Sequence, residues 1–451
     1  MAEPCELPLS EALASLKDRS LSATELIVSC LDRIAAHDPQ IGAFARVFAD
    51  EAMERAAALD DSGPQAPLHG IPVAVKDLIE VAGHPTEAGS GAYAGHVGDR
   101  DAGVVGMLRQ CGAIIIGKSN THELAFGVST PATRNPWSLD RMTGGSSGGS
   151  AAALAAAMVP AALGTDTGGS VRNPSSYCGT VGLKTTPGLV ARDGLFMLST
   201  SYDVIGPMAR SCTDAALLLS AMVAPGPFGR LDQGATAWRE TVVGVPDDSY
   251  YEGLQLAPPV ESALNNKIAQ IRSTGAPVVE VAPPPHREHS EAGSVVVAAE
   301  ALHQHRRALT EEPELVSDDI RAFIGIADGL SALDLAAAHA AVSRFRQRWQ
   351  RVFDHVDFVV SPVTPNHVPP HGLSQMDGVP LIPATTPFTF PLNGAGLVAL
   401  AVPDGLAGDG LPVGVQIIGP AGSDRRLLRF GQDLEAAGFV SVSLAPLVAP
   451  A

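Results

Sequence analysis

The segment GGSSGGSAAALAAAMVPAALGTDTGGS, residues 144–170, constrains the fold more than any other part of the chain. Two clusters of Gly and Ser enclose an alanine-rich run, which is followed by VPAALGTD (159–166), a pattern typical of a strand. A flexible Gly/Ser linker is polar throughout, so the apolar middle of this segment argues against one. We expect a helix–strand unit with a Gly/Ser cluster at each end.

The surrounding chain alternates between apolar runs and segments with helical spacing. IPVAVKD (71–77) and AIIIGK (113–118) are short apolar runs, and DAGVVGMLRQCG (101–112) between them has helical character. TDAALLLSAM (213–222) is a further helix candidate. Because such alternation is typical of α/β proteins, it predicts an α/β core with a mixed or parallel sheet.

We expect one large domain made of four segments. Residues 1–64 form an N-terminal helical segment with two amphipathic helices, and residues 65–224 form the core. Residues 225–355 form a mostly helical insertion that begins with a strand–helix–strand unit. Residues 356–451 complete the core sheet, with strands expected within 358–366 and 398–419.

The composition excludes several classes of protein. The net charge of −18 and the absence of a basic run argue against direct nucleic-acid binding, although a partner subunit could still bind RNA. The N-terminus lacks the features of a signal peptide, and no apolar run is long enough to span a membrane. The five cysteines are unclustered, which predicts a cytoplasmic protein without a zinc site or another metal site.

Three functional patterns match the Gly/Ser clusters only in part. A P-loop requires GxxxxGK[ST], which does not occur, and DTG at 166–168 has no second copy, which an aspartic protease would need. The GxSxG pattern of α/β-hydrolases occurs twice, around Ser146 and around Ser147. It requires Asp and His partners downstream, and most of the downstream histidines lie in the expected helical insertion. A serine esterase of this type remains an alternative.

The two clusters together indicate a different chemistry. Glycines let backbone N–H groups approach a ligand closely, and a row of such donors can hold a developing oxyanion. DTGGS offers the N–H groups of Thr167, Gly168 and Gly169, followed by Ser170 as a nucleophile. A serine needs a base, and a buried neutral lysine can serve as one. Lys76 is the candidate, with Ser146 or Ser147 as a proton relay.

The chain resembles the amidase signature family. The resemblance is carried by residues 144–184, by LHGIPVAVKD (68–77), by GKSNTHELAFG (117–127), by RNPW (134–137) and by GLPVGVQIIG (410–419). It implies a central mixed β-sheet surrounded by helices, and it implies no cofactor. It also implies a Ser–cis-Ser–Lys triad of Ser170, Ser146 and Lys76.

The resemblance assigns further residues near the triad. It implies an oxyanion hole formed by the backbone N–H groups of Thr167, Gly168, Gly169 and Ser170. Asp166 and Arg172 match structural positions and are expected to form an ion pair. Cys178 is expected to be a buried packing residue.

The expected function is hydrolysis of a small-molecule carboxamide to a carboxylate and ammonia or an amine, through an acyl-enzyme. The alternatives are the glutaminase-like component of a tRNA-dependent amidotransferase and a catalytically silent binding homologue. A homodimer is left open. The stretch VSTPATRNPW (128–137) is shorter than the family pattern, which favours a free-standing enzyme with its own substrate pocket.

Overall fold

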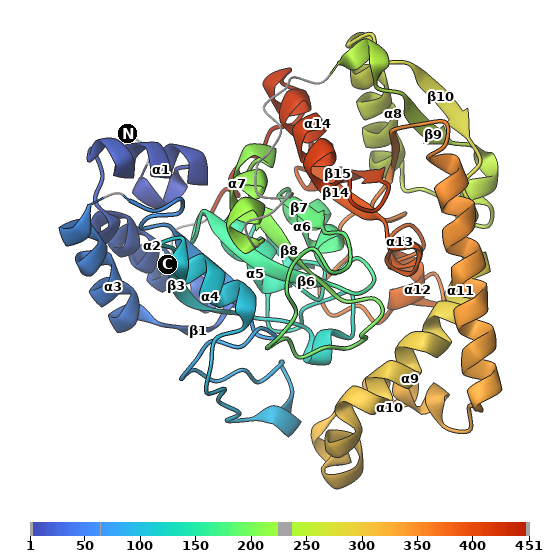
Figure 1. Cartoon of the computed structure of the whole chain (residues 1–451), viewed down its shortest axis with the longest axis horizontal. Helices are drawn as coiled ribbons and strands as arrows, with labels where there is room; N and C mark the ends of the chain where they lie inside the picture. The colour runs from blue at the N-terminus through green and yellow to red at the C-terminus, as the bar shows by residue number, and fades with distance from the viewer. Residues whose placement is uncertain (1–2, 64, 224–236, 448–451) are drawn as a thin grey trace.

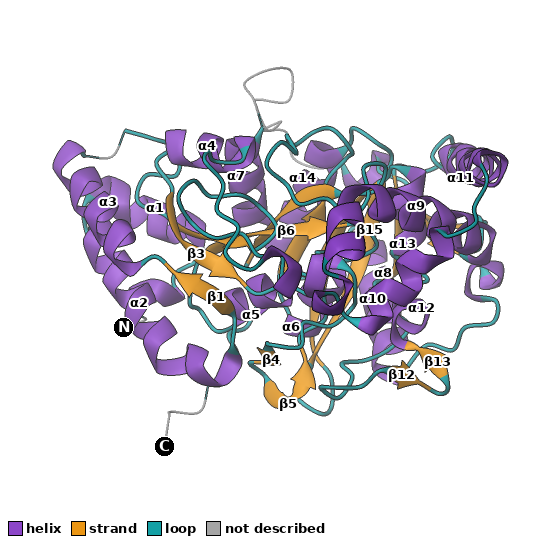
Figure 2. Ribbon diagram, turned by 90° about the horizontal axis from the view of Figure 1, so that it is seen from below, coloured by secondary structure: helices purple, strands orange, loops and turns teal. Residues whose placement is uncertain are grey.

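A mixed β-sheet of 11 strands runs through the molecule, with helices on both sides (Figure 1, Figure 2). The computed structural model describes residues 3–63, 65–223 and 237–447. Helices from the N-terminal segment lie at one end of the molecule, and helices from the second half of the chain lie at the other (Figure 1). This arrangement confirms the expected α/β domain with a central mixed sheet surrounded by helices.

The strands are β1 (Phe44–Val47), β2 (Pro72–Lys76), β3 (Ile114–Ser119), β4 (Arg134–Asn135), β5 (Ser138–Met142), β6 (Ala161–Asp166), β7 (Val181–Lys184), β8 (Val204–Ala209), β9 (Val243–Pro246), β10 (Val278–Val281), β11 (Phe358–Pro362), β12 (Gln375–Met376), β13 (Val379–Pro380), β14 (Val398–Leu406) and β15 (Pro412–Gly419).

The α-helices are α1 (Leu9–Asp18), α2 (Ala23–Ile41), α3 (Ala49–Ser62), α4 (Gly103–Gln110), α5 (Gly148–Ala155), α6 (Arg172–Cys178), α7 (Cys212–Met222), α8 (Pro258–Ser273), α9 (Arg287–Glu311), α10 (Asp318–Ile324), α11 (Ala332–Val352), α12 (Leu381–Thr385), α13 (Phe390–Ala395) and α14 (Asp424–Ala436). None of the described helices has the length and apolar composition that a membrane span requires.

The large sheet has the strand order β1-β3-β2-β6-β8-β7-β14-β15-β11-β9-β10. β2 pairs in parallel with β3 on one side and with β6 on the other, and β6 pairs antiparallel with β8. The carboxyl ends of β2 and β6 therefore lie side by side at one edge of the sheet. All residues of β2, β3 and β6 are buried, which explains why their sequences read as continuous apolar runs.

The segment between the two Gly/Ser clusters forms the expected helix and strand, α5 and β6. All residues of α5 are buried, because Ala and Gly side chains allow it to pack closely against its neighbours. Gly149 shows how close this packing is. A Cβ atom there would lie 2.4 Å from the carbonyl oxygen of Ala43 and 2.5 Å from the backbone nitrogen of Asn120.

Two details differ from the sequence-based expectations. Residues 44–47 form β1, a short strand that pairs antiparallel with β3, so the N-terminal segment is not purely helical. β1 was missed because it is a four-residue strand with two exposed residues and no apolar run. The expected helical insertion adds β9 and β10 to the far edge of the sheet, while its boundary near residue 224 lies outside the described residues.

Two glycines in helices should respond in opposite ways to the same substitution. Gly149→Ala should lower the free energy of unfolding by about 1–3 kcal/mol, because backbone atoms of Ala43 and Asn120 block the added methyl group. Gly106→Ala in α4 meets nothing within 4 Å and should raise it by about 0.5–1 kcal/mol, because alanine favours the helix. Chemical unfolding monitored by circular dichroism measures both. Equal shifts of the two variants would contradict this packing.

Candidate active site

Lys76 is the last residue of β2, and its amine lies among hydroxyl groups. The Nζ atom is hydrogen-bonded to Ser146 Oγ at 2.7 Å, to Ser147 Oγ at 2.9 Å and to Thr165 Oγ1 at 2.8 Å. The side chain is fully buried, and no carboxylate among the described residues forms an ion pair with it. Burial lowers the pKa of Lys76 to about 7, although Asp166 and Asp203 oppose this shift. At neutral pH a large share of the amine is therefore uncharged.

A second buried lysine shows that burial alone does not make a base. Burial, followed by the charge of Arg172, lowers the pKa of Lys184 to about 7 as well. Its Nζ donates to the carbonyl oxygens of Thr185 at 3.0 Å and Leu397 at 2.5 Å. Carbonyl groups have no proton to give, so only Lys76 is placed to accept one from a hydroxyl.

The first Gly/Ser cluster presents Ser146 to Lys76. The peptide bond between Gly145 and Ser146 is cis. The Thr130 hydroxyl lies within hydrogen-bond distance of the carbonyl oxygens of Gly144 (3.1 Å) and Ser146 (3.3 Å), and the Gly148 N–H donates to it at 3.1 Å. Thr130 thus fixes the backbone on both sides of Ser146.

The second cluster brings Ser170 beside the first one through its backbone. The Ser147 N–H donates to the Ser170 carbonyl oxygen at 3.1 Å. Ser170 keeps 6% of its surface exposed, and its hydroxyl forms no hydrogen bond with the rest of the described chain. The structure therefore joins Lys76 directly to Ser146, whereas the Ser170 hydroxyl is left free beside them. Hydrogen bonds between catalytic groups are often unformed before substrate binds.

The turn at residues 166–170, which we call the DTGGS loop, carries the expected oxyanion donors. Within the described ranges, the N–H groups of Thr167, Gly168 and Ser170 have no hydrogen-bond acceptor. The Gly169 N–H differs, because it donates to Asp166 Oδ1 at 2.8 Å. Three of the four expected donors are thus open to a ligand in this structure, and the fourth shapes the loop.

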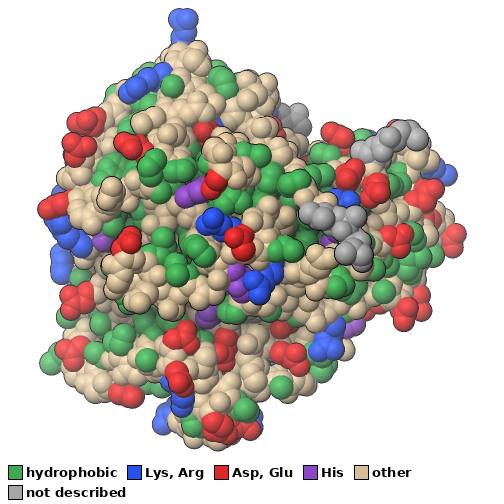
Figure 3. Space-filling view, turned by 180° about the vertical axis from the view of Figure 1, so that it is seen from behind, with side chains coloured by type: hydrophobic (Ala, Val, Ile, Leu, Met, Phe, Trp, Pro, Cys, Tyr) green, Lys and Arg blue, Asp and Glu red, His purple; other side chains and the backbone are tan. Residues whose placement is uncertain are grey.

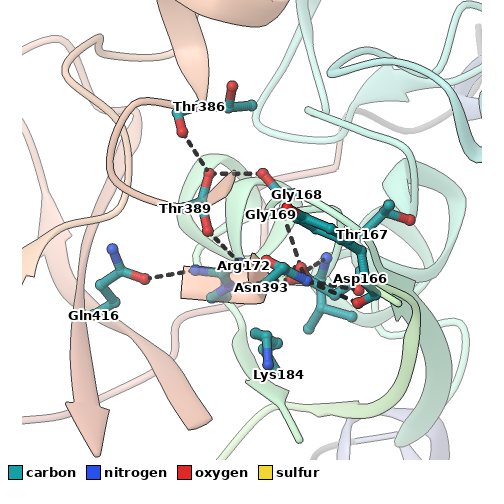
Figure 4. Close-up of polar contacts among 12 residues, drawn as sticks. Asp166, Thr167, Gly168, Gly169, Arg172, Lys184, Thr386, Thr389, Asn393 and Gln416 are labelled. Carbon is teal, nitrogen blue, oxygen red and sulfur yellow. Dashed lines mark hydrogen bonds and ion pairs between the residues drawn. The ribbon is translucent and has the colours of Figure 1, made fainter. Parts of the chain in front are cut away.

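Asp166 and Arg172 form the expected buried ion pair (Figure 4). Arg172 donates to both carboxylate oxygens, from Nη2 to Oδ1 at 3.0 Å and from Nε to Oδ2 at 3.1 Å. Burial alone would raise the pKa of Asp166, but the Arg172 guanidinium holds it below its ordinary range. Removing one partner of such a pair costs about 3–5 kcal/mol, because the other charge stays buried.

Residues far away in the sequence complete this network. Arg172 also donates to Gln416 Oε1 at 3.0 Å and to Asn393 Oδ1 at 2.7 Å, and Asn393 Nδ2 returns a bond to the Asp166 carbonyl at 2.9 Å (Figure 4). Sequence reasoning missed Asn393 and Gln416. A signal for Gln416 exists, because it is a single polar residue within the apolar strand VGVQIIG.

Two other residues near the site do not act as nucleophile or base here. Cys178 is fully buried, and burial raises the pKa of its thiol, which confirms the expected packing role. The His122 backbone N–H donates to the Ser146 carbonyl at 3.2 Å, and burial lowers the pKa of its ring. Among the described residues, no cluster of His, Cys, Asp and Glu is placed to hold a metal ion.

Comparison with known proteins identifies the family. A family model described as Amidase matches residues 25–428. The A-type component of the glutamyl-tRNA(Gln) amidotransferase of Roseiflexus sp. (strain RS-1) is 36% identical over 467 residues, which cover 94% of this chain and 95% of that protein. An amidase of Pseudomonas putida is 36% identical over 460 residues, which cover 97% of both chains.

Solved structures agree with this assignment. A crystal structure of an amidase matches with a TM-score of 0.88 and 32% sequence identity, and the match covers 96% of this chain and 100% of the other. The chain is an amidohydrolase and belongs to the amidase signature family.

Proposed function

We propose that the protein hydrolyses a small carboxamide to a carboxylate and ammonia or an amine, with Ser170 as nucleophile, Ser146 as proton relay and Lys76 as base. The observation that carries this proposal is the buried Lys76 amine, which is 2.7 Å from the Ser146 hydroxyl and has a pKa of about 7. A base acts best when its pKa lies near the operating pH.

Acylation begins when neutral Lys76 takes the proton of Ser146 and Ser146 takes the proton of Ser170. The Ser170 Oγ atom bonds to the amide carbon, and the carbonyl oxygen becomes an oxyanion. The C–N bond then breaks, and the proton returns through Ser146 to the leaving nitrogen. Water repeats the same steps on the acyl-enzyme and releases the carboxylate. No cofactor is required in these steps.

The open N–H groups of the DTGGS loop support the oxyanion. Thr167, Gly168 and Ser170 have free backbone donors there, and preorganised donors of this kind stabilise a tetrahedral intermediate. We assign the oxyanion to these three donors. The Gly169 N–H keeps its bond to Asp166 and holds the loop in shape.

The alternative is the glutaminase-like component of a tRNA-dependent amidotransferase, which would release ammonia from glutamine for a partner. Similarity does not separate the two functions, because relatives with both names are 36% identical. We favour the free-standing amidase because the 128–137 loop departs from the family pattern. On the face shown in Figure 3, basic side chains are scattered among acidic ones without forming a continuous basic patch of described residues. All five cysteines are unpaired, which fits the cytoplasmic location proposed from the sequence.

Ser170→Ala should reduce amide turnover by more than roughly 10⁴-fold, because the nucleophile is lost while the fold is kept. A fluorophosphonate probe should label Ser170 in the parent enzyme, as read by peptide mass spectrometry. Ser176→Ala changes another buried serine just downstream, on α6, and should keep near-parental activity. Labelling at Ser147 or Cys178 in place of Ser170 would contradict the assigned roles.

The rate should rise with pH through about 7 and then level off, because deprotonation of Lys76 creates the base. The sign follows from the lowered pKa, since the neutral amine predominates only above it. Lys76→Met should lower kcat by roughly 10²–10⁴-fold at all pH values. Lys17→Met, at an exposed lysine, is the control. A parental pH profile in Lys76→Met would show that another base operates.

The purified chain alone should release ammonia or an amine from at least one small carboxamide. A panel of aliphatic, aryl and arylacetic amides with glutamine and asparagine tests this by detecting the released nitrogen product. Ser170→Ala serves as the blank for contaminating activity. Activity on glutamine alone, and only in the presence of a partner and charged tRNA, would favour the amidotransferase function.

A further inference from the structure

The DTGGS loop is anchored from outside at three consecutive residues. Arg172 holds the carboxylate of Asp166, and the Thr389 hydroxyl donates to the carbonyl oxygen of Gly168 at 2.8 Å. Between them, the Thr167 hydroxyl donates to Asp203 Oδ1 at 2.6 Å. The amidase mechanism above assigns no role to Asp203.

We propose that Asp203 is a positioning residue of this active site, whose carboxylate fixes Thr167 so that the open N–H groups of the DTGGS loop face the oxyanion, and whose charge acts on Lys76. This proposal rests on the proposed amidase function. Asp203 does not contact the reacting atoms and acts through Thr167 and Lys76.

Asp203 is itself rigidly held and almost completely buried. Its second oxygen, Oδ2, accepts the N–H groups of Leu198 at 2.7 Å and Ser199 at 3.1 Å, and Arg192 Nη1 donates to its carbonyl at 3.0 Å. With both backbone donors on Oδ2, Oδ1 is left for the Thr167 hydroxyl. A carboxylate held in this way can fix the direction of a neighbouring side chain.

Helix α9 supports the turn that carries Asp203. Glu300 of α9 accepts the Ser201 N–H at 3.0 Å and is hydrogen-bonded to the hydroxyls of Ser199 and Ser201. On the same helix, His289 Nε2 is hydrogen-bonded to the Tyr202 hydroxyl at 2.8 Å. The inserted helical segment therefore holds residues 199–203, and residue 203 in turn holds the DTGGS loop.

The charge of Asp203 also reaches the base. The charged groups that act on Lys76 are Asp166 and Asp203, which both favour its ammonium form, while His122 is the titratable ring nearby. Burial lowers the pKa of His122, so this ring is neutral near neutral pH. Asp166 is neutralised by Arg172, whereas Asp203 has only hydrogen-bond donors at its carboxylate.

The Thr167 hydroxyl can be removed without changing the charge or the shape of the side chain. Thr167→Val should lower kcat by roughly 10- to 100-fold with little change in KM, because a displaced donor weakens binding of the transition state only. Thr167→Ser keeps the hydroxyl and should retain near-parental kcat. Parental kcat in Thr167→Val, an equal loss in both variants, or a loss confined to KM would each overturn the proposal.

Asp203→Asn tests the electrostatic part. Loss of the negative charge removes an interaction that favours the ammonium form of Lys76, so the acid limb of the rate profile should move to lower pH. Thr167→Val keeps the charge and should leave that midpoint in place. Asp61→Asn removes an exposed carboxylate and is the control. An unmoved acid limb in Asp203→Asn would overturn this part of the proposal.

Circular dichroism checks that each variant folds. If Asp203→Asn does not fold, the comparison of Thr167→Val with Thr167→Ser still decides the positioning role. A failed amidase function would appear differently, as unchanged turnover in Ser170→Ala. The two proposals can therefore fail independently.

Discussion

A buried lysine without a carboxylate partner is the constraint on which this site depends. Carboxylates lie close to Lys76, but other groups occupy them. Asp77, the next residue, pairs with Lys118 at 3.1 Å, and Asp166 is held by both ends of the Arg172 guanidinium. If either carboxylate turned to Lys76, the amine would stay charged and could not act as a base. The ion pairs around the site therefore keep the lysine amine available.

The sheet topology explains how distant segments meet at this amine. β2 and β6 are parallel neighbours, so Lys76 and the DTGGS loop emerge at the same edge. The polypeptide returns along α5 before entering β6, and the short, alanine-rich helix places Ser146 beside the end of β2. Small residues in α5 are needed because the helix packs against backbone atoms of its neighbours. The alanine-rich run between the two clusters is thus a spacer that positions the relay serine.

The sequence predicted much of this arrangement because its signals are local. Apolar runs located β2, β3 and β6, and the glycines around Ser146 and Ser170 marked both turns. Partners from distant segments were missed, as Asn393 and Thr165 show. Thr165 is a polar residue within a buried strand, and only the folded chain places its hydroxyl 2.8 Å from Lys76. The bond from the Gly169 N–H to Asp166 depends on loop geometry, which composition does not encode.

The protonation of Lys76 can be measured directly, because the chain has only five lysines. Lysine labelled with ¹³C at Cε reports the titration of each amine by NMR, and Lys76→Arg and Lys184→Arg identify the two buried lysines that lack a carboxylate partner. The account predicts that Lys76 titrates at about 7, while the exposed Lys17 titrates like a lysine in water. A Lys76 amine that stays protonated up to the pH at which Lys17 titrates would contradict the assignment of Lys76 as the base.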